Sequence, residues 1–84
     1  MMKVTIDGRE YQAATAVALI DEIKDIHFAA TKDTDAEGYI AIQQGTHRRM
    51  MERELELPDG DTEARALAMF KAIAALGSWG FKEE

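Results

Sequence analysis

The one cationic stretch of the chain is a candidate anion-binding site. It runs from His47 to Arg53 and holds three arginines, Arg48, Arg49 and Arg53, against one glutamate. On a helix, Arg49 and Arg53 lie one turn apart, where their guanidinium groups can bind a phosphate or carboxylate through paired hydrogen bonds. Arginines also favour the negative C-terminal end of a helix. The sequence leaves both interpretations open.

Catalytic spacing is absent around the two histidines, His27 and His47. Both fall on apolar helical stripes, where a histidine usually satisfies its ring nitrogens locally. The row of Glu52, Glu54 and Glu56 is most simply the solvated face of a strand. The chain has no cysteine, which excludes disulfides and thiolate chemistry. It also lacks a glycine-rich phosphate loop, so we expect neither an enzyme nor a cofactor.

An acidic loop supplies the second candidate site. Asp33, Asp35 and Glu37 stand at alternate positions, and a glycine follows them. This run resembles the first two-thirds of an EF-hand calcium loop, which implies a weak calcium site over residues 33–44. The resemblance ends at Gln44, which stands where an EF-hand has a bidentate glutamate. The alternative, which we favour, is a polar loop whose acids begin a helix, with no metal bound.

Trp79 and Phe81 form the third candidate. They are two residues apart near the end of the chain, so they share one side of a short extended segment. An exposed aromatic pair is a typical contact for a partner protein. The same pair can also cover the open end of a small core.

The elements that position these residues begin with a β-hairpin over residues 3–12. Asp7-Gly8 is a favoured type I′ turn pair, since both of its residues adopt positive φ readily. This turn sets Val4 opposite Tyr11, so that Val4, Ile6 and Tyr11 share one face of the ribbon.

Apolar periodicity predicts helices over residues 15–29 and from Asp61 or Thr62 to Leu76. The stretch between them has two interpretations. One is a helix over residues 35–52, begun by a Thr34-x-x-Glu37 capping box and followed by a strand near Glu54–Leu57. The other is a second hairpin over residues 39–57. We favour the helix, because seven residues share one of its faces: Ala36, Tyr39, Ile40, Gln43, His47, Met50 and Met51.

Composition indicates the class of protein. The 84 residues are 46% hydrophobic, which suits one globular domain spanning residues 1–84. The predicted fold is α+β: a hairpin, three helices, and short strands near Glu54–Leu57 and Trp79–Lys82 that complete a small antiparallel sheet. A net charge of −6 makes nucleic acid an unlikely partner. No signal peptide or membrane span is recognisable, so the expected compartment is the cytoplasm. We expect a non-enzymatic module that binds protein, either a second copy or another chain.

Overall fold

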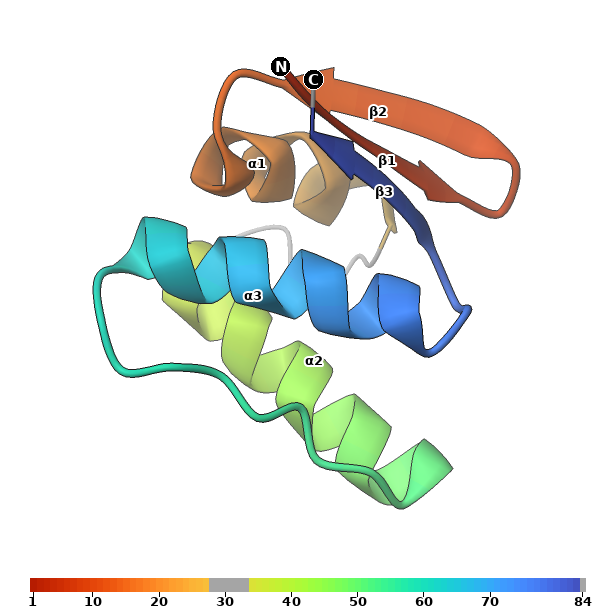
Figure 1. Cartoon of the computed structure of the whole chain (residues 1–84), viewed down its shortest axis with the longest axis vertical. Coiled ribbons are helices and arrows are strands. Elements are labelled where there is room, and N and C mark those ends of the chain that lie inside the picture. Colours follow the sequence, from red (N-terminus) through yellow and green to blue (C-terminus); the bar gives the residue numbers. More distant parts are fainter. Residues whose placement is uncertain (28–33, 84) are drawn as a thin grey trace.

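The computed structural model describes residues 1–27, with side chains up to Lys24, and residues 34–83. It confirms the α+β fold (Figure 1). The elements follow one another in the order β1 (Met2–Ile6), β2 (Arg9–Ala13), α1 (Ala16–His27), α2 (Ala36–Met51), α3 (Thr62–Ala75) and β3 (Gly80–Glu83).

The three strands form one antiparallel sheet with the order β2-β1-β3. The predicted hairpin is confirmed, because Val4 pairs with Tyr11 and the turn residues Asp7 and Gly8 have φ of 51° and 81°. On its other side Val4 pairs with Phe81 of β3. The strand predicted near Trp79–Lys82 therefore exists, one residue further along the chain.

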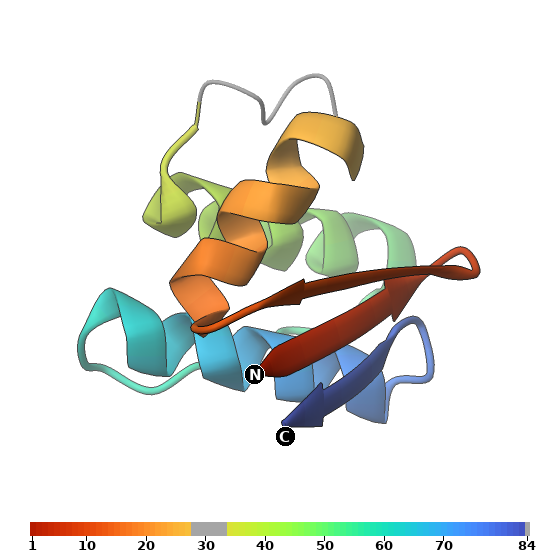
Figure 2. The same cartoon turned by 90° about the horizontal axis from the view of Figure 1, so that it is seen from above.

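The helices cover one face of this sheet. β1 and β2 pack on α1, β3 packs on α3, and α2 packs against α1 and α3 on the side away from the sheet (Figure 1). Seen from above, the strands and α1 lie nearest the viewer, with α2 and α3 behind them (Figure 2). Val4 and Ile6 are buried against the helices, whereas Thr5 on the opposite face of β1 is exposed.

The core contains most of the residues that the helical periodicity predicted. On α1 the stripe of Ala16, Leu19, Ile20 and Ile23 is buried, while the side chains of Ile26 and His27 lie outside the described part of the chain. On α3 the fully buried residues are Ala66, Met69, Phe70 and Ile73. The same apolar spacing places Leu67 and Ala74 on the inward face of α3 and Leu76 beside it, but these three residues are only half-buried.

A carboxylate from α3 closes the start of α1. Glu63 Oε2 and Oε1 accept hydrogen bonds from the backbone N–H groups of Ala16 and Val17, at 2.8 and 2.9 Å. The Thr15 hydroxyl oxygen accepts a third bond, from Ala18 N at 3.1 Å. These bonds satisfy donors that have no partner inside the helix, so they fix how α1 and α3 meet.

The helix interpretation of residues 35–52 is correct, but the capping box is not. Asp35, rather than Thr34, caps α2: its Oδ1 accepts a hydrogen bond from Gly38 N at 2.8 Å. Glu37 turns away from the cap and pairs with Arg65 of α3, at 3.1 Å. Because α2 runs unbroken to Met51, the hairpin alternative over residues 39–57 is wrong.

The strand predicted near Glu54–Leu57 does not form. Leu55 is only 5% exposed while Glu54 and Glu56 are exposed, so the alternating pattern does describe burial. The segment runs along the helices on the side away from the sheet, however, and none of the strands in the described part of the chain lies beside it (Figure 1). It is held instead by the Gln44 side chain, whose Nε2 donates to the Leu55 carbonyl at 3.1 Å. Alternation predicts which side chains are buried, but a strand also requires a neighbouring strand.

Candidate interaction surface

The face of α2 that packs on the core extends past the core at the C-terminal end of the helix, where its residues are exposed. It is buried from Ala36 to His47, but Met50 is 79% exposed and Met51 42% exposed. Both methionines follow His47 at helical spacing, so they extend the same face. In Figure 1, α2 diverges from α3, and its C-terminal end lies at the edge of the molecule farthest from the sheet. The two methionines therefore share the predicted face, but no core covers them.

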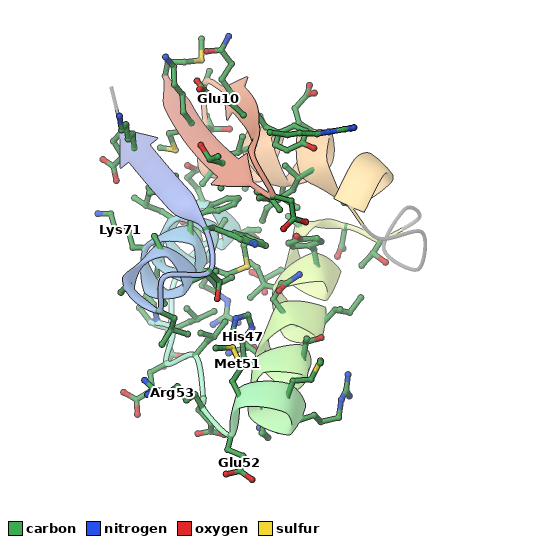
Figure 3. All side chains as sticks on the ribbon, turned by 90° about the vertical axis from the view of Figure 1, so that its right-hand side faces the viewer. Glu10, His47, Met51, Glu52, Arg53 and Lys71 are labelled. Atoms are coloured by element: carbon green, nitrogen blue, oxygen red, sulfur yellow. The ribbon has the colours of Figure 1, made fainter. Side chains whose placement is uncertain are left out.

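Exposed large apolar side chains gather on this helix. Within the described part of the chain they are Met1, Ile42, Met50 and Met51, and three of these four belong to α2. Figure 3 places Met51 beside His47, on the side of α2 that faces the chain leading to α3. Met50 and Met51 adjoin each other at the end of α2, whereas Ile42 lies more than two turns away. Contiguous exposed apolar side chains typically mark a contact surface, whereas scattered ones do not.

The predicted arginines surround these methionines, but not as a helical pair. α2 ends at Met51, and Glu52 adopts a left-handed conformation with φ of 53°, so Arg53 follows a sharp turn. Arg49 and Arg53 therefore do not share a helical face, and that prediction is wrong. Arg48 Nη2 pairs with Glu54 Oε1 at 3.1 Å on the exposed surface. Among the described residues, Arg49 and Arg53 have no ion pair.

A groove adjoins this end of α2. It has a volume of about 470 Å³ and lies between the segment after α2 and the last turns of α3. Its lining residues are Arg53, Glu54, Leu55, Glu56, Ala72, Ala75 and Leu76. Small and apolar side chains thus form one wall, and charged side chains form the rim.

Trp79 and Phe81 lie elsewhere and are half-buried. The Phe81 ring stacks on Phe70, with 5.4 Å between ring centroids and 6° between planes, and the Trp79 ring lies 6.0 Å from Phe70. Phe70 is fully buried. The pair therefore covers the end of the core, which is the second of the two interpretations that the sequence left open.

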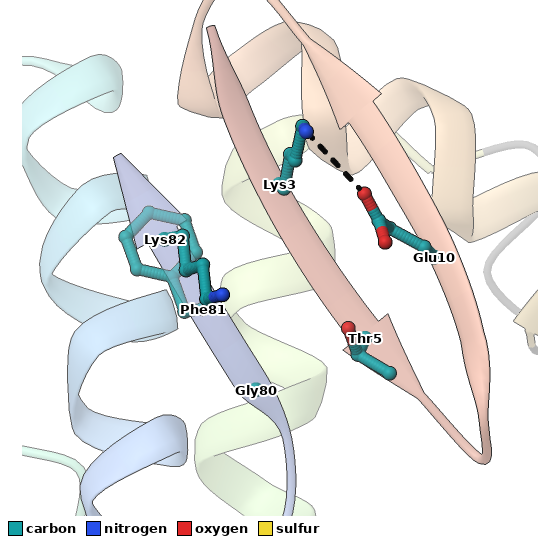
Figure 4. A pocket seen from close by; sticks show the side chains of 6 residues that line it. All are labelled: Lys3, Thr5, Glu10, Gly80, Phe81 and Lys82. Atoms are coloured by element: carbon teal, nitrogen blue, oxygen red, sulfur yellow. Dashed lines mark ion pairs between the residues drawn. The ribbon is translucent and has the colours of Figure 1, made fainter. Parts of the chain in front are cut away.

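The exposed face of the sheet carries a polar hollow of about 330 Å³ (Figure 4). Lys3 and Lys82 lie directly opposite each other there, and Lys3 Nζ is 3.7 Å from Glu10 Oε1. The other lining residues are Thr5, Gly80 and Phe81. This hollow is lined mainly by charged and polar side chains, in contrast to the exposed methionines at the end of α2.

The acidic loop shows no calcium geometry in its described part. Asp33 lies outside the described residues. Asp35 caps α2 and Glu37 pairs with Arg65, and the backbone is helical from Ala36 onward, where an EF-hand would continue as a loop. Among the residues that the structure describes, no group of three or more His, Cys, Asp and Glu side chains is placed to hold a metal ion.

Three polar side chains on the inward face of α2 are buried: Tyr39, Gln43 and His47. His47 Nδ1 lies 2.9 Å from the Gln43 carbonyl oxygen, as expected for a locally satisfied histidine. Tyr39 Oη and Gln43 Nε2 have no hydrogen-bond partner in the described part of the chain. Burial raises the pKa of the Tyr39 hydroxyl well above its usual range, and the neighbouring Gln43 side chain opposes this only in part. In the sequence, these three residues are recognisable because they recur every four positions on an otherwise apolar helical face.

No protein-family model matches the chain, and no curated protein or solved structure is significantly similar to it. Within the described residues, no helix has the length and apolar character needed to cross a bilayer.

Proposed function

We propose that this protein is an interaction module that binds another protein through the open end of α2, defined as Met50, Met51, Arg49 and the adjoining Arg53. One observation carries the proposal: the apolar face of α2 is buried as far as His47 and is then uncovered at two consecutive methionines. Methionine is a flexible, polarizable side chain that is common at protein-binding surfaces.

The charges around this surface support a protein partner more than a phosphate-rich one. Between residues 48 and 56, Arg48, Arg49 and Arg53 are balanced by Glu52, Glu54 and Glu56, so the local formal charge is zero. Nucleic-acid surfaces instead need a net positive field, because affinity arises largely from neutralised phosphates. Apolar side chains within a rim of mixed charge are typical of protein–protein interfaces.

Site-specific photo-crosslinking tests the proposal directly. Position 50 is replaced by the photoreactive residue p-benzoylphenylalanine, and the chain is expressed in its native cells at its native level. Gln12 on β2 is the matched control, because its side chain is also exposed but lies on the sheet, on the opposite side of the molecule. Mass spectrometry then identifies each adduct.

We expect one or a few discrete protein adducts from position 50 and none of the same species from position 12. An adduct of twice the 9.4 kDa chain mass identifies a second copy as the partner. An adduct of any other mass identifies a different protein. No adduct at position 50, or the same set of adducts from both positions, would overturn the proposal.

A further inference from the structure

The segment between α2 and α3 presents an unused backbone edge. Within the described part of the chain, the N–H groups of residues 54–57 donate no hydrogen bond. Alternate donors that face no partner, beside a groove with an apolar wall, form an arrangement to which an extended peptide can add as a strand.

The existing hydrogen bonds show which edge is free. Arg53 N donates to the His47 carbonyl at 3.3 Å and so closes the last turn of α2. The Leu55 carbonyl accepts from Gln44 at 3.1 Å, so Leu55 turns its backbone groups toward α2. In an extended chain the N–H and C=O groups of successive residues point to opposite sides. The backbone groups of Glu54 and Glu56 therefore point away from α2.

From this edge and the groove beside it, we infer that the site takes an extended segment of a partner protein in which basic and apolar residues alternate. Side chains on one face of such a strand would lie beside the exposed Glu56 and beside Glu54, which also pairs with Arg48 at 3.1 Å. Cross-strand pairs of opposite charge are stabilising. Side chains on the other face would enter the groove over Ala72 and Ala75, whose small size leaves room for them. The inference rests on the proposed function and specifies the kind of partner.

Charge disfavours a second copy of the same segment as the occupant. In this chain, Glu52, Glu54 and Glu56 alternate with Arg53, Leu55 and Leu57, so pairing the segment with itself places glutamates opposite glutamates. Like charges directly opposite one another destabilise a strand pair. Two copies also repel at long range, since each carries a net charge of −6, whereas a basic segment is attracted.

A pair of blocked heptapeptides tests the inference: one alternates valine with lysine, and the other alternates valine with glutamate. Each is titrated into the full chain and followed by amide NMR. We expect the lysine peptide to bind at least tenfold more tightly, with its largest amide shifts at Glu54 and Glu56. N-methylation of its lysines should weaken binding at least tenfold, because those N–H groups face the free edge, whereas N-methylation of its valines should change binding less than twofold.

Variants of the chain provide the matched controls. Ala75→Phe fills the groove and should weaken binding of the lysine peptide about tenfold. Ala64→Phe, at an equally exposed position in the first turns of α3, should leave binding within twofold. Glu56→Lys should weaken binding of the lysine peptide at least fivefold and improve binding of the glutamate peptide.

The possible failures are distinguishable. Equal binding of both peptides, or no effect of N-methylation, overturns the strand inference. If amide shifts at residues 54–57 appear on concentrating the chain alone, a second copy occupies the edge and the inference is again wrong. In either case the proposed function stands if position 50 still gives discrete crosslinks, and it fails only if those crosslinks are absent.

Discussion

The sequence predicts two apolar groups, the pair of Trp79 and Phe81 and the helical face that ends in Met50 and Met51, and the fold treats them in opposite ways. Phe81 stacks on the buried ring of Phe70 and pairs with Val4 across the sheet. Met50, at the end of α2, is 79% exposed. The difference follows from position, because β3 is anchored to the central strand whereas the end of α2 projects beyond α3. Hydrophobicity alone therefore does not show which apolar residues fold a small domain and which remain available for a partner.

The largest expected effect comes from the covered patch. Phe81→Ala should lower the free energy of unfolding by about 2 kcal/mol, roughly half the value for a fully buried phenylalanine, because Phe81 is half-buried. Met50→Ala should change it by less than about 0.5 kcal/mol. Urea denaturation of both variants measures this contrast, and equal losses would contradict the distinction between the two patches.

The next largest effect concerns the start of α1, which a side chain of α3 caps. Glu63→Ala removes the carboxylate that accepts hydrogen bonds from Ala16 N and Val17 N. We expect a loss of about 1–2 kcal/mol in the free energy of unfolding, as for other helix caps. Glu56→Ala, an exposed glutamate near the open end of α2, is the control and should be nearly neutral. A neutral result for Glu63→Ala would show that α1 does not depend on α3 for its cap.

A pH measurement probes the buried part of α2. The pKa of Tyr39 is raised in the folded chain, while in the unfolded chain it stays near 10. Above pH 10 the unfolded state therefore releases a proton that the folded state keeps, and stability falls by up to about 1.4 kcal/mol per pH unit. In the Tyr39→Phe variant, the free energy of unfolding should therefore fall less steeply between pH 10 and 11.5. Parallel stability curves for the two proteins would show that Tyr39 is accessible.

The smallest effect lies in the middle of the same helix. Gly45→Ala should raise the free energy of unfolding by about 0.5–1 kcal/mol, because alanine loses less backbone entropy in a helix. A Cβ at this position would meet only the Arg49 side chain, at an ordinary 3.7 Å. Thermal or urea unfolding measures the gain, and destabilisation would mean that α2 packs more tightly around Gly45 than the structure indicates.

Local chemistry was sufficient to predict most of the fold. The Asp7-Gly8 turn fixed the hairpin register. Of the two predicted starts of α3, Asp61 caps the helix, and Leu76 ends it as predicted. These signals act within a few residues of one another. The strand near Glu54–Leu57 was predicted wrongly, because strand formation depends on a neighbour that no local pattern specifies.

The candidate surface was predictable only in part. The arginines of residues 48–53 were singled out, but Met50 and Met51 were counted toward the buried face of the helix. Whether they are buried depends on where α3 diverges from α2, which is a tertiary property. The cap that Glu63 of α3 supplies to α1 could not be predicted from the sequence either, since it joins groups 46 and 47 residues apart in the chain.

The central claim is that the open end of α2 serves binding and not folding. Met50→Lys tests it most directly when its free energy of unfolding is measured together with photo-crosslinking from position 51, the other exposed methionine of this surface. We predict a change in stability below about 0.5 kcal/mol and loss of the crosslinked partner. A loss of more than about 1 kcal/mol with crosslinking unchanged would contradict the claim and show that Met50 belongs to the packed core.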